Sequence, residues 1–364
     1  MINSKDISVI VQGPINKRET PKCLKSIREF LPDAEIIVST WNEQDVSGLD
    51  YDILVLNDAP ESVLIEKVKH RTIYNNLNRQ LLSTQEGLKK ANRKYAMKLR
   101  SDLILTNNSF LDYFDKFQQR TQKYNLFERK ILTAALFTRF NIKVNKQGKR
   151  QKMPFHISDW WFFGLREDLN KYFLDTPLVK EPEFTNYFSL EENKSKETPY
   201  GKAMFKFGPE QYFGYECFRR NFNDIYMEDA ADYSDELMEN FRVCLVNNFI
   251  VLEFEQSGIY LNKYPYSRNE KFSGDQYIDL YNFHRYEVEY KKYCNSNYEI
   301  TTPSQLFENE KRGYALLRVY KHIAKLTDTE TPLFQKLEQL FVGIPVSIIN
   351  YIAIAINEKL RSRK

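Results

Sequence analysis

The residues with the clearest chemical potential lie in the segment 98–105, KLRSDLIL. An apolar run is interrupted there by Arg100, Ser101 and Asp102, at the point where a strand is expected to end. Ligands of open α/β sheets gather outside the carboxyl ends of strands, where an aspartate can hold a divalent cation against phosphate groups. The alternative is an aspartate that only caps a turn. The first interpretation predicts a site for a phosphate-bearing ligand, with Mn²⁺ or Mg²⁺ on Asp102.

Other polar residues follow two further predicted strands. Gln12, Gly13 and Pro14 end the first strand, where glycine and proline bring the backbone close to a ligand. Asn57 and Asp58 end the third strand. We expect these five residues to meet the base and ribose of a nucleotide, with ordinary turn residues as the alternative.

Two basic side chains extend the candidate set. Arg79, on a predicted helix, is expected to supplement Arg100 in binding a diphosphate, and its alternative is a surface residue in an ion pair. His156 is a candidate for the acceptor side, although a lone histidine is more often structural.

Two acidic residues are candidates for the general base that deprotonates a hydroxyl group. Glu210 follows Pro209 at a predicted helix start, where an acidic residue is also favoured by the helix dipole alone. Asp159 stands beside Trp160 and Trp161, whose rings can stack on sugar faces. A tryptophan pair buried in the core is the alternative for this second group.

Short apolar runs predict the strands that position these residues. The predicted strands are 7–11, 36–39, 53–56, 95–99, 131–140 and 156–164, and the predicted helices include 20–30, 71–92 and one that starts at Pro209. Strands separated by helical segments are typical of a parallel sheet, in which the carboxyl ends share one edge. The sequence therefore predicts an α/β fold with a cleft at that edge.

Composition limits the class of partner. The 53 basic and 49 acidic residues give a net charge of +4, which is too balanced for a dedicated nucleic-acid binder. Four widely separated cysteines have no metal-ligand spacing, so we expect free thiols in a reducing cytoplasm. The N-terminus lacks a basic region followed by an apolar one, which argues against secretion.

The C-terminal segment has a different character. Residues 340–356 are almost wholly apolar, and Lys359, Arg361, Arg363 and Lys364 follow directly. The run is short of the ~20 residues of a spanning helix, and Gly343 and Pro345 interrupt it. We expect a helix on the anionic inner face of the cytoplasmic membrane. Packing on the protein core or in a dimer contact is the alternative.

Several segments in order resemble the WavE-type lipopolysaccharide-synthesis glycosyltransferases. They are VQGPI, SIREFLPDAEIIVSTW, NRQLLSTQEGL, KLRSDL, SDWWFFG and PEQYF, which span about residues 7–219. The resemblance implies a GT-A-like fold, with a single Rossmann-type nucleotide-binding domain and a mostly helical C-terminal extension. In GT-A enzymes a D-x-D motif ends the fourth strand and binds the metal, and Arg100, Ser101 and Asp102 stand at the matching positions. A guanidinium therefore replaces one carboxylate, which puts strict metal dependence in doubt.

The resemblance also implies a function and a domain plan. Residues 1–225 are expected to form the catalytic domain, 226–330 an extension that completes the acceptor side, and 331–364 the membrane-associating helices. The expected reaction is inverting transfer from a nucleotide sugar, with a UDP-linked donor expected, to a lipid-linked or surface-glycan acceptor in lipopolysaccharide or capsule synthesis. A non-catalytic nucleotide- or glycan-binding subunit and a sugar-phosphate transferase are the alternatives.

Overall fold

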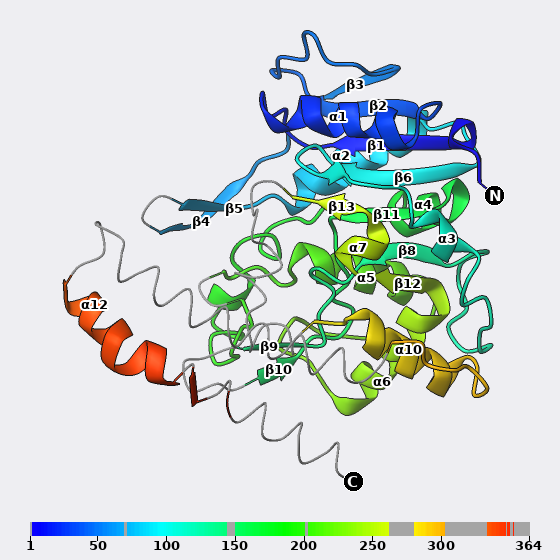
Figure 1. Ribbon diagram of the computed structural model, residues 1–364. Coiled ribbons are helices and arrows are strands. Elements are labelled where there is room, and N and C mark those ends of the chain that lie inside the picture. Colours follow the sequence, from blue (N-terminus) through cyan, green and yellow to red (C-terminus); the bar gives the residue numbers. More distant parts are fainter. Residues whose placement is uncertain are drawn as a thin grey trace. The chain divides into compact units, whose positions relative to one another are not determined.

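The computed structural model describes residues 2–68, 71–143, 150–200, 203–261, 280–302, 333–346, 348–349 and 352. The chain divides into two compact units. The first comprises Met1–Lys263 and Leu280–Glu299, and the second comprises Tyr264–Asp279 and Ile300–Lys364. Figure 1 shows the elements of the first unit arranged around one large sheet.

The central sheet has seven strands in the order β12-β8-β11-β6-β1-β2-β3. Their bounds are β1 Ile7–Gln12, β2 Glu35–Trp41, β3 Ile53–Asn57, β6 Tyr95–Arg100, β8 Ile131–Ala134, β11 Trp161–Leu165 and β12 Phe249–Leu252. Strand β11 runs antiparallel to its neighbours β6 and β8, and the other neighbouring pairs are parallel. This mostly parallel sheet confirms the predicted α/β class.

Helices pack against this sheet and connect its strands. The longer ones are α1 Glu19–Phe30, α2 Leu77–Lys90, α4 Arg166–Phe173, α5 Pro209–Arg219, α6 Asp235–Asn248 and α10 Phe283–Tyr293. All six residues of β1 are buried, as expected for a central parallel strand covered on both faces. Helix α2 approaches β1 closely at Gly87, where an added Cβ would lie 2.4 Å from Cγ2 of Ile10.

Short elements complete the described parts of the chain. They are η1 Ser4–Asp6, β4 Val63–Val68, β5 Arg71–Asn75, β7 Ile104–Leu105, α3 Leu111–Phe114, β9 Asn141–Lys143, β10 Arg150–Lys152, η2 Tyr187–Ser189, α7 Phe254–Ser257, β13 Ile259–Tyr260, α12 Leu333–Glu338 and a π-helix at Gln339–Gly343. Strands β4 and β5 form an antiparallel hairpin, as do β9 and β10.

Three predicted elements had wrong bounds. The helix predicted over 71–92 begins at Leu77, because Arg71–Asn75 pairs with β4 as strand β5. The strand predicted over 131–140 ends at Ala134, and the one predicted over 156–164 begins at Trp161. The strands predicted at 7–11, 36–39, 53–56 and 95–99 are confirmed, each extended by a few residues at most.

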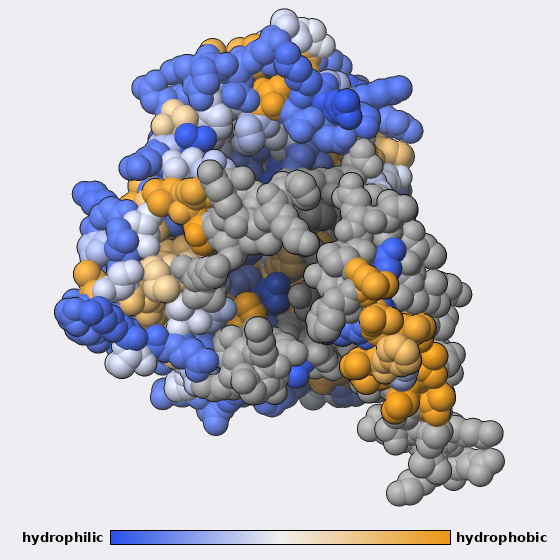
Figure 2. Space-filling view, turned by 90° about the vertical axis from the view of Figure 1, so that its left-hand side faces the viewer, coloured by the Kyte–Doolittle hydropathy of each residue, from blue (hydrophilic) through white to orange (hydrophobic). Residues whose placement is uncertain are grey.

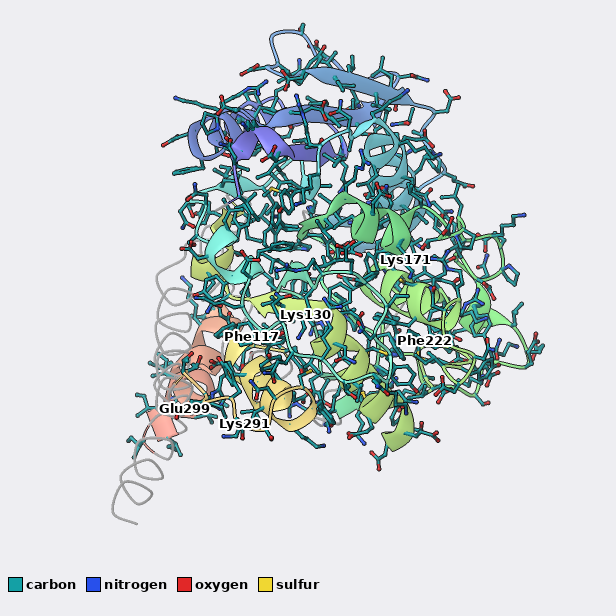
Figure 3. All side chains as sticks on the ribbon, turned by 90° about the vertical axis from the view of Figure 1, so that its right-hand side faces the viewer. Phe117, Lys130, Lys171, Phe222, Lys291 and Glu299 are labelled. Carbon is teal, nitrogen blue, oxygen red and sulfur yellow. The ribbon has the colours of Figure 1, made fainter. Side chains whose placement is uncertain are left out.

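An aromatic cluster joins the later part of the first unit to the sheet. Phe117 contacts the rings of Phe283, Tyr286 and Tyr290 on α10, with centroid distances of 5.0–5.8 Å (Figure 3). Nearby, buried Lys130 donates a hydrogen bond from Nζ to the carbonyl oxygen of Val246 at 2.6 Å. Strand β12 and helix α10, from the segment expected to complete the acceptor side, thus belong to the compact unit that contains the sheet.

The described part of the second unit is apolar and exposed. Its helix α12 and π-helix carry Leu333 at 74% and Phe341 at 71% exposure, and Ile349 beyond them is 64% exposed. Figure 2 shows apolar atoms gathered on this segment. Within the described residues, none of the helices has the length and apolar character needed to cross a bilayer.

Candidate functional site

A cavity of about 570 Å³ opens at the carboxyl ends of strands β1, β2 and β6. It is lined by Gln12, Gly13, Pro14, Asn16, Arg18, Glu19, Trp41, Asn76, Arg79, Gln80, Arg100, Ser101 and Asp102. Seven of the residues predicted for donor binding therefore share one cavity. Three arginines face two acidic residues in this lining, so the cavity suits an anionic ligand.

The floor of the cavity is backbone from two neighbouring strands. Gly13 has a φ of +114°, a conformation that favours glycine, and its N–H donates to the carbonyl oxygen of Ser39 at 3.1 Å. The Ser101 N–H donates to the carbonyl oxygen of Gln12 at 3.0 Å, and Ser101 Oγ donates to that of Pro14 at 2.7 Å. These bonds fix the ends of β1 and β6 together before any ligand arrives.

Arg79 and Trp41 form one wall. Arg79 Nε donates to the carbonyl oxygen of Pro60 at 2.7 Å, and its Cζ lies 5.8 Å from the centre of the Trp41 ring. The Gln12 side chain is fixed by helix α2, because its Oε1 accepts a hydrogen bond from Ser83 Oγ at 2.8 Å. Arg79 is thus an oriented cavity residue rather than a surface residue in an ion pair.

Arg100 and Asp102 form a two-point ion pair in the cavity. Arg100 Nε donates to Asp102 Oδ1 at 3.0 Å, and Nη2 donates to Oδ2 at 2.9 Å. The guanidinium also lies over Trp160, with Cζ 5.1 Å from the ring centre. Both side chains of the pair keep some exposure, 24% and 18%. The positive charge of Arg100 is therefore held in a fixed place that solvent and ligand can reach.

The residues around Asp102 match a divalent cation site poorly. Mg²⁺ and Ca²⁺ require several oxygen ligands, and Asp102 offers oxygens that already accept hydrogen bonds from Arg100. Across the described ranges, no group of three or more His, Cys, Asp or Glu side chains is arranged to hold a metal ion. The cation expected on Asp102 stays a prediction, and no chemical step below depends on it.

A buried polar cluster lies behind the ion pair. Lys98, two residues before Arg100 on β6, is fully buried and donates a hydrogen bond from Nζ to the backbone oxygen of Asp159. Burial lowers the pKa of Lys98 to about 8, although the negative charges of Asp159, Asp102 and Glu210 oppose this change. The Asp159 side chain is 5% exposed, and its Oδ1 has no hydrogen-bond partner among the described residues.

Glu210 belongs to the same cluster and has a strongly perturbed carboxyl group. Helix α5 begins at Pro209, as predicted, and the Glu210 carbonyl oxygen accepts from the N–H of Ile157 at 3.1 Å. Burial, followed by the negative charge of Asp159, raises the pKa of Glu210 to about 7. A carboxyl group with this pKa can gain or lose a proton near neutral pH, which general acid–base catalysis requires.

His156 lies beside Glu210 but is held in the neutral form. Its Nδ1 lies 3.0 Å from the carbonyl oxygen of Phe137, so Nδ1 carries the proton. Burial lowers the pKa of His156 to about 3. Its Nε2 is 4.0 Å from Glu210 Oε2, which is too long for a hydrogen bond. With 3% exposure, the ring packs against the site and does not line the cavity.

Six more predicted site residues lie outside the cavity lining, namely Glu210, Asp159, Trp160, Asn57, Asp58 and Trp161. Asn57 is buried, and its Nδ2 donates to Ser39 Oγ at 3.1 Å and to the carbonyl oxygen of Thr40 at 2.9 Å. Asp58 accepts from Asn42 Nδ2 at 2.6 Å. Trp161 is fully buried against Phe110, with the ring centroids 5.5 Å apart, so it cannot stack on a sugar.

Six lining residues were absent from the sequence prediction. They are Asn16, Arg18, Glu19, Trp41, Asn76 and Gln80. Trp41 had a recognisable signal, because it is the last residue of an apolar strand beside β1. Asn76 and Gln80 lie at the start of α2. They come close to the ends of β1 and β6 only when the whole sheet has formed, so no local sequence pattern pointed to them.

Comparison with known protein families identifies the family of the chain. The model of the family described as WavE lipopolysaccharide synthesis matches residues 7–320, which include every residue of the cavity and of the cluster around Glu210. No curated protein matches the chain. The protein therefore belongs to the WavE lipopolysaccharide-synthesis family.

Proposed function

We propose that the protein is a glycosyltransferase that moves a sugar from a nucleotide donor to a lipid-linked or surface-glycan acceptor. The family places the chain in lipopolysaccharide synthesis. The observation that carries the finer proposal is an arginine-rich cavity with Glu210 close behind it, a 20% exposed acid with a pKa of about 7 whose charge interacts with that of Arg100. We further propose a UDP-linked donor, inverting chemistry and the GT-A-like fold, because Arg100, Ser101 and Asp102 end the fourth strand of the sheet in chain order.

The cavity supplies what a departing nucleoside diphosphate requires. The guanidinium groups of Arg79 and Arg100 can each give two hydrogen bonds to phosphate oxygens, and the Trp41 ring offers a flat apolar surface. The strand ends at Gly13 and Ser101 leave room for the diphosphate to approach the backbone. Positive charge that is already oriented stabilises the leaving group without reorganisation of solvent.

Glu210 is the proposed base. The acceptor hydroxyl oxygen forms a bond with the anomeric carbon, the bond from that carbon to the diphosphate oxygen breaks, and Glu210 takes the hydroxyl proton. Inversion follows from this single displacement. Asp159 raises the pKa of Glu210 by its negative charge, so in this proposal it acts as a positioning residue. Trp160 is 4% exposed and lies under the Arg100 guanidinium, so in this proposal it orients Arg100 and does not contact the acceptor sugar.

We propose that the protein acts at a membrane surface. The exposed apolar side chains of residues 333–352 and the basic residues that follow them fit the interface of an anionic membrane. A lipid-linked acceptor at the inner face of the cytoplasmic membrane lies in that interface.

Product analysis with a panel of UDP- and GDP-sugars tests the reaction. The protein is incubated with each donor and with delipidated or intact lipopolysaccharide acceptor, and the nucleotide product is identified. Release of nucleoside diphosphate coupled to sugar transfer supports the proposal. Release of nucleoside monophosphate points to the sugar-phosphate transferase, and nucleotide binding without turnover points to the binding subunit.

Arg79→Ala is the matched test of the cavity. It should weaken binding of UDP about tenfold or more, because a charged hydrogen bond is worth roughly 1.5–3 kcal/mol. Arg93→Ala is the control, since Arg93 is exposed just before the start of β6, at the opposite end of that strand. Equal affinity in the two variants would contradict the placement of the nucleotide.

A further inference from the structure

A second cavity, of about 440 Å³, shares no lining residue with the first. It is formed by helix α5, by residues 206–207 and 223–228, and by Glu183. Its volume lies within the roughly 300–1,000 Å³ that is usual for small-molecule sites. Neither the family description nor the chemistry proposed above uses it.

The geometry of α5 separates this cavity from the proposed reaction centre. Tyr212, Tyr215, Glu216 and Arg219 have the spacing i, i+3, i+4, i+7, which puts them on one face of the helix. Glu210 stands two residues before Tyr212 and so lies about 200° around the axis from that face. One helix therefore carries the candidate base on one side and the second cavity on the other.

The lining combines rings with charged side chains. Phe207, Tyr212, Tyr215 and Tyr226 contribute aromatic surface, and the Phe207 and Tyr215 ring centroids are 5.2 Å apart. Tyr226 is 70% exposed, which leaves one face of its ring open to a ligand. Rings of this kind form a flat apolar surface with polar groups at the edge.

The charges disfavour an anionic ligand. Lys206 Nζ lies 2.6 Å from Glu183 Oε1, and Arg219 Nε lies 2.7 Å from Glu216 Oε1, so both cations of the lining are paired with carboxylates. Glu228 adds a third acidic residue. The three carboxylates outnumber the two cations, so this lining carries a net negative charge that repels a phosphate, whereas a neutral hydroxyl can donate to a carboxylate and accept from a cation.

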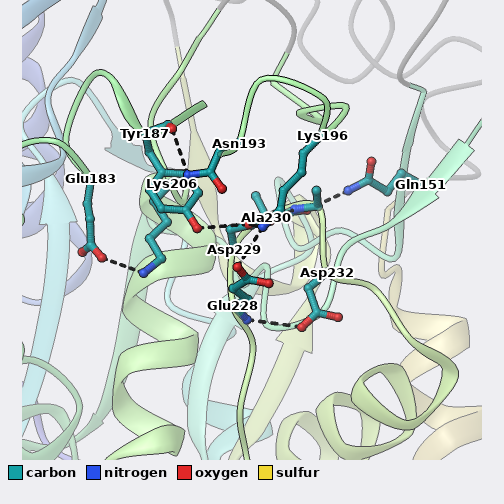
Figure 4. Close-up of polar contacts among 11 residues, drawn as sticks. Gln151, Glu183, Tyr187, Asn193, Lys196, Lys206, Glu228, Asp229, Ala230 and Asp232 are labelled. Atoms are coloured by element: carbon teal, nitrogen blue, oxygen red, sulfur yellow. Dashed lines mark hydrogen bonds and ion pairs between the residues drawn. The ribbon is translucent and has the colours of Figure 1, made fainter. Parts of the chain in front are cut away.

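The chain segment that follows the lining residue Glu228 is already held in place. Lys196 Nζ contacts Glu228 Oε1 at 2.9 Å and Asp229 Oδ2 at 2.6 Å, and Gln151 Nε2 donates to the carbonyl oxygen of Ala230 at 2.7 Å (Figure 4). Such a network reduces the entropy lost when a ligand binds. Three rings of the lining are packed in the wall and Tyr226 is open to solvent. A cavity with one open ring, paired cations and no net positive charge matches a polyhydroxylated, uncharged ligand.

We propose that this cavity binds a neutral saccharide unit of the glycan, away from the end that reacts. The inference uses membership in a lipopolysaccharide-synthesis family as the source of the glycan, and it does not depend on the transferase activity. A site on the far face of α5 lets the protein retain a glycan chain independently of the reacting end.

Saturation-transfer NMR and calorimetry with neutral trisaccharides of glucose and galactose test the proposal, with UDP as the anionic comparison. The intact protein should bind at least one trisaccharide, and Tyr226→Ala should weaken that binding roughly five- to tenfold through loss of the open ring. Tyr226 is largely exposed, so its replacement leaves the fold intact. Tyr233→Ala is the matched control, because Tyr233 is 38% exposed and lies outside the lining.

Glu210→Gln separates this site from the proposed reaction centre. Trisaccharide binding should be unchanged in Glu210→Gln, whether or not the protein proves to be a transferase. Three results would overturn the inference: no trisaccharide binds the intact protein, Tyr226→Ala binds as the intact protein does, or Glu210→Gln loses the binding that Tyr226→Ala retains.

Discussion

The carboxyl groups of Asp102 and Glu210 have different surroundings in the site. Asp102 is tied to a guanidinium in the cavity, whereas the Glu210 side chain is 20% exposed and lies near Asp159. Desolvation and the negative charge of Asp159 raise the pKa of Glu210 to about 7. Glu210 can therefore exchange a proton near neutral pH.

The first prediction concerns Glu210. Because the base must be ionised, kcat/KM should rise with pH through about 7 and then level off. Glu210→Gln should lose about 10²–10⁴ in rate while UDP binding is retained. Glu191→Gln, at a highly exposed glutamate, is the control and should keep the wild-type profile. A rising limb that persists in Glu210→Gln would assign the titration to another group.

The same pKa makes a prediction about stability. The folded pKa of Glu210 lies above its ordinary value of 4.5, so the stabilisation from its protonated form is fully present below pH 4.5. It is lost as pH rises through about 7. Wild type should therefore lose Tm relative to Glu210→Gln between these pH values, as measured by calorimetry. Parallel Tm curves for the two proteins would show that the carboxyl group titrates normally.

Arg100 leads to a prediction about metal dependence. If its guanidinium supplies the positive charge at the diphosphate, UDP should bind the wild type equally well with and without a chelator. Arg100→Asp restores the D-x-D pattern with Asp102, and it should make UDP binding depend on Mn²⁺. Titration calorimetry measures both effects, and Arg100→Lys serves as a charge-conserving control. Loss of wild-type UDP binding on chelation would show that a metal is needed.

At the scale of elements, α5 is positioned by a glycine. An added Cβ at Gly214 would lie 2.4 Å from the backbone oxygen of Phe155, so the helix rests directly on that chain segment. Gly214→Ala gains helix propensity of about 1 kcal/mol but forces this contact apart. We expect a net loss of about 1–3 kcal/mol in the free energy of unfolding, with lower activity because Glu210 moves.

Thermal unfolding of Gly214→Ala measures that loss. Gly48→Ala is a useful comparison, because a Cβ there would meet nothing within 4 Å although the φ of +72° carries its own strain. An unchanged or raised Tm in Gly214→Ala would mean that α5 can shift without cost.

The sequence predicted the positions of the strands better than the directions of their side chains. Continuous apolar runs identified β1, β2, β3 and β6, and the strand-end rule brought Gln12–Pro14 and Arg100–Asp102 to one cavity. The pair Trp160 and Trp161 shows a limit, because neighbouring residues at a strand face opposite sides of the sheet. Both rings are buried, but only that of Trp160 lies against Arg100, whereas Trp161 packs on Phe110.

Two other predictions were wrong because they depend on contacts between residues far apart in the sequence. Asn57 ends strand β3, as predicted, but β3 is the edge strand of the sheet. The Asn57 side chain donates hydrogen bonds to residues of β2 and does not face the cavity. Residues 71–75 share an apolar pattern with the helix that follows, and only pairing with β4 makes them a strand. Local sequence carries no information about either partner.

At the scale of the whole molecule, the two units differ in what they expose. The first buries its large side chains around the sheet, while the described part of the second exposes leucine, isoleucine, valine and phenylalanine. Apolar exposure of this kind marks a surface that binds a membrane or another protein. The basic residues at the end of the chain favour an anionic membrane.

This asymmetry gives the last prediction. Phe341→Glu combined with Ile349→Glu should weaken binding to phosphatidylglycerol vesicles about tenfold or more, since two apolar anchors become acidic. Leu178→Glu, at a 39% exposed leucine of the first unit, is the control. Vesicle co-sedimentation at low and high salt measures the effect. Equal sedimentation of both variants with wild type would assign the apolar segment to a protein contact.

Among the described strands of the central sheet, β11 alone runs against its neighbours, and this direction decides which part of the chain can reach the site. Since β11 runs against β6, with Trp161 opposite Leu99, the residues that precede it stand at the edge where its neighbours finish. Asp159 therefore reaches Lys98 and Trp160 reaches Arg100, although both residues come before their strand and not after it. Changes of length upstream of β11 can reshape the surroundings of Glu210 while the arginine-rich cavity keeps its form, so under the proposed function relatives with different acceptors should differ in this loop.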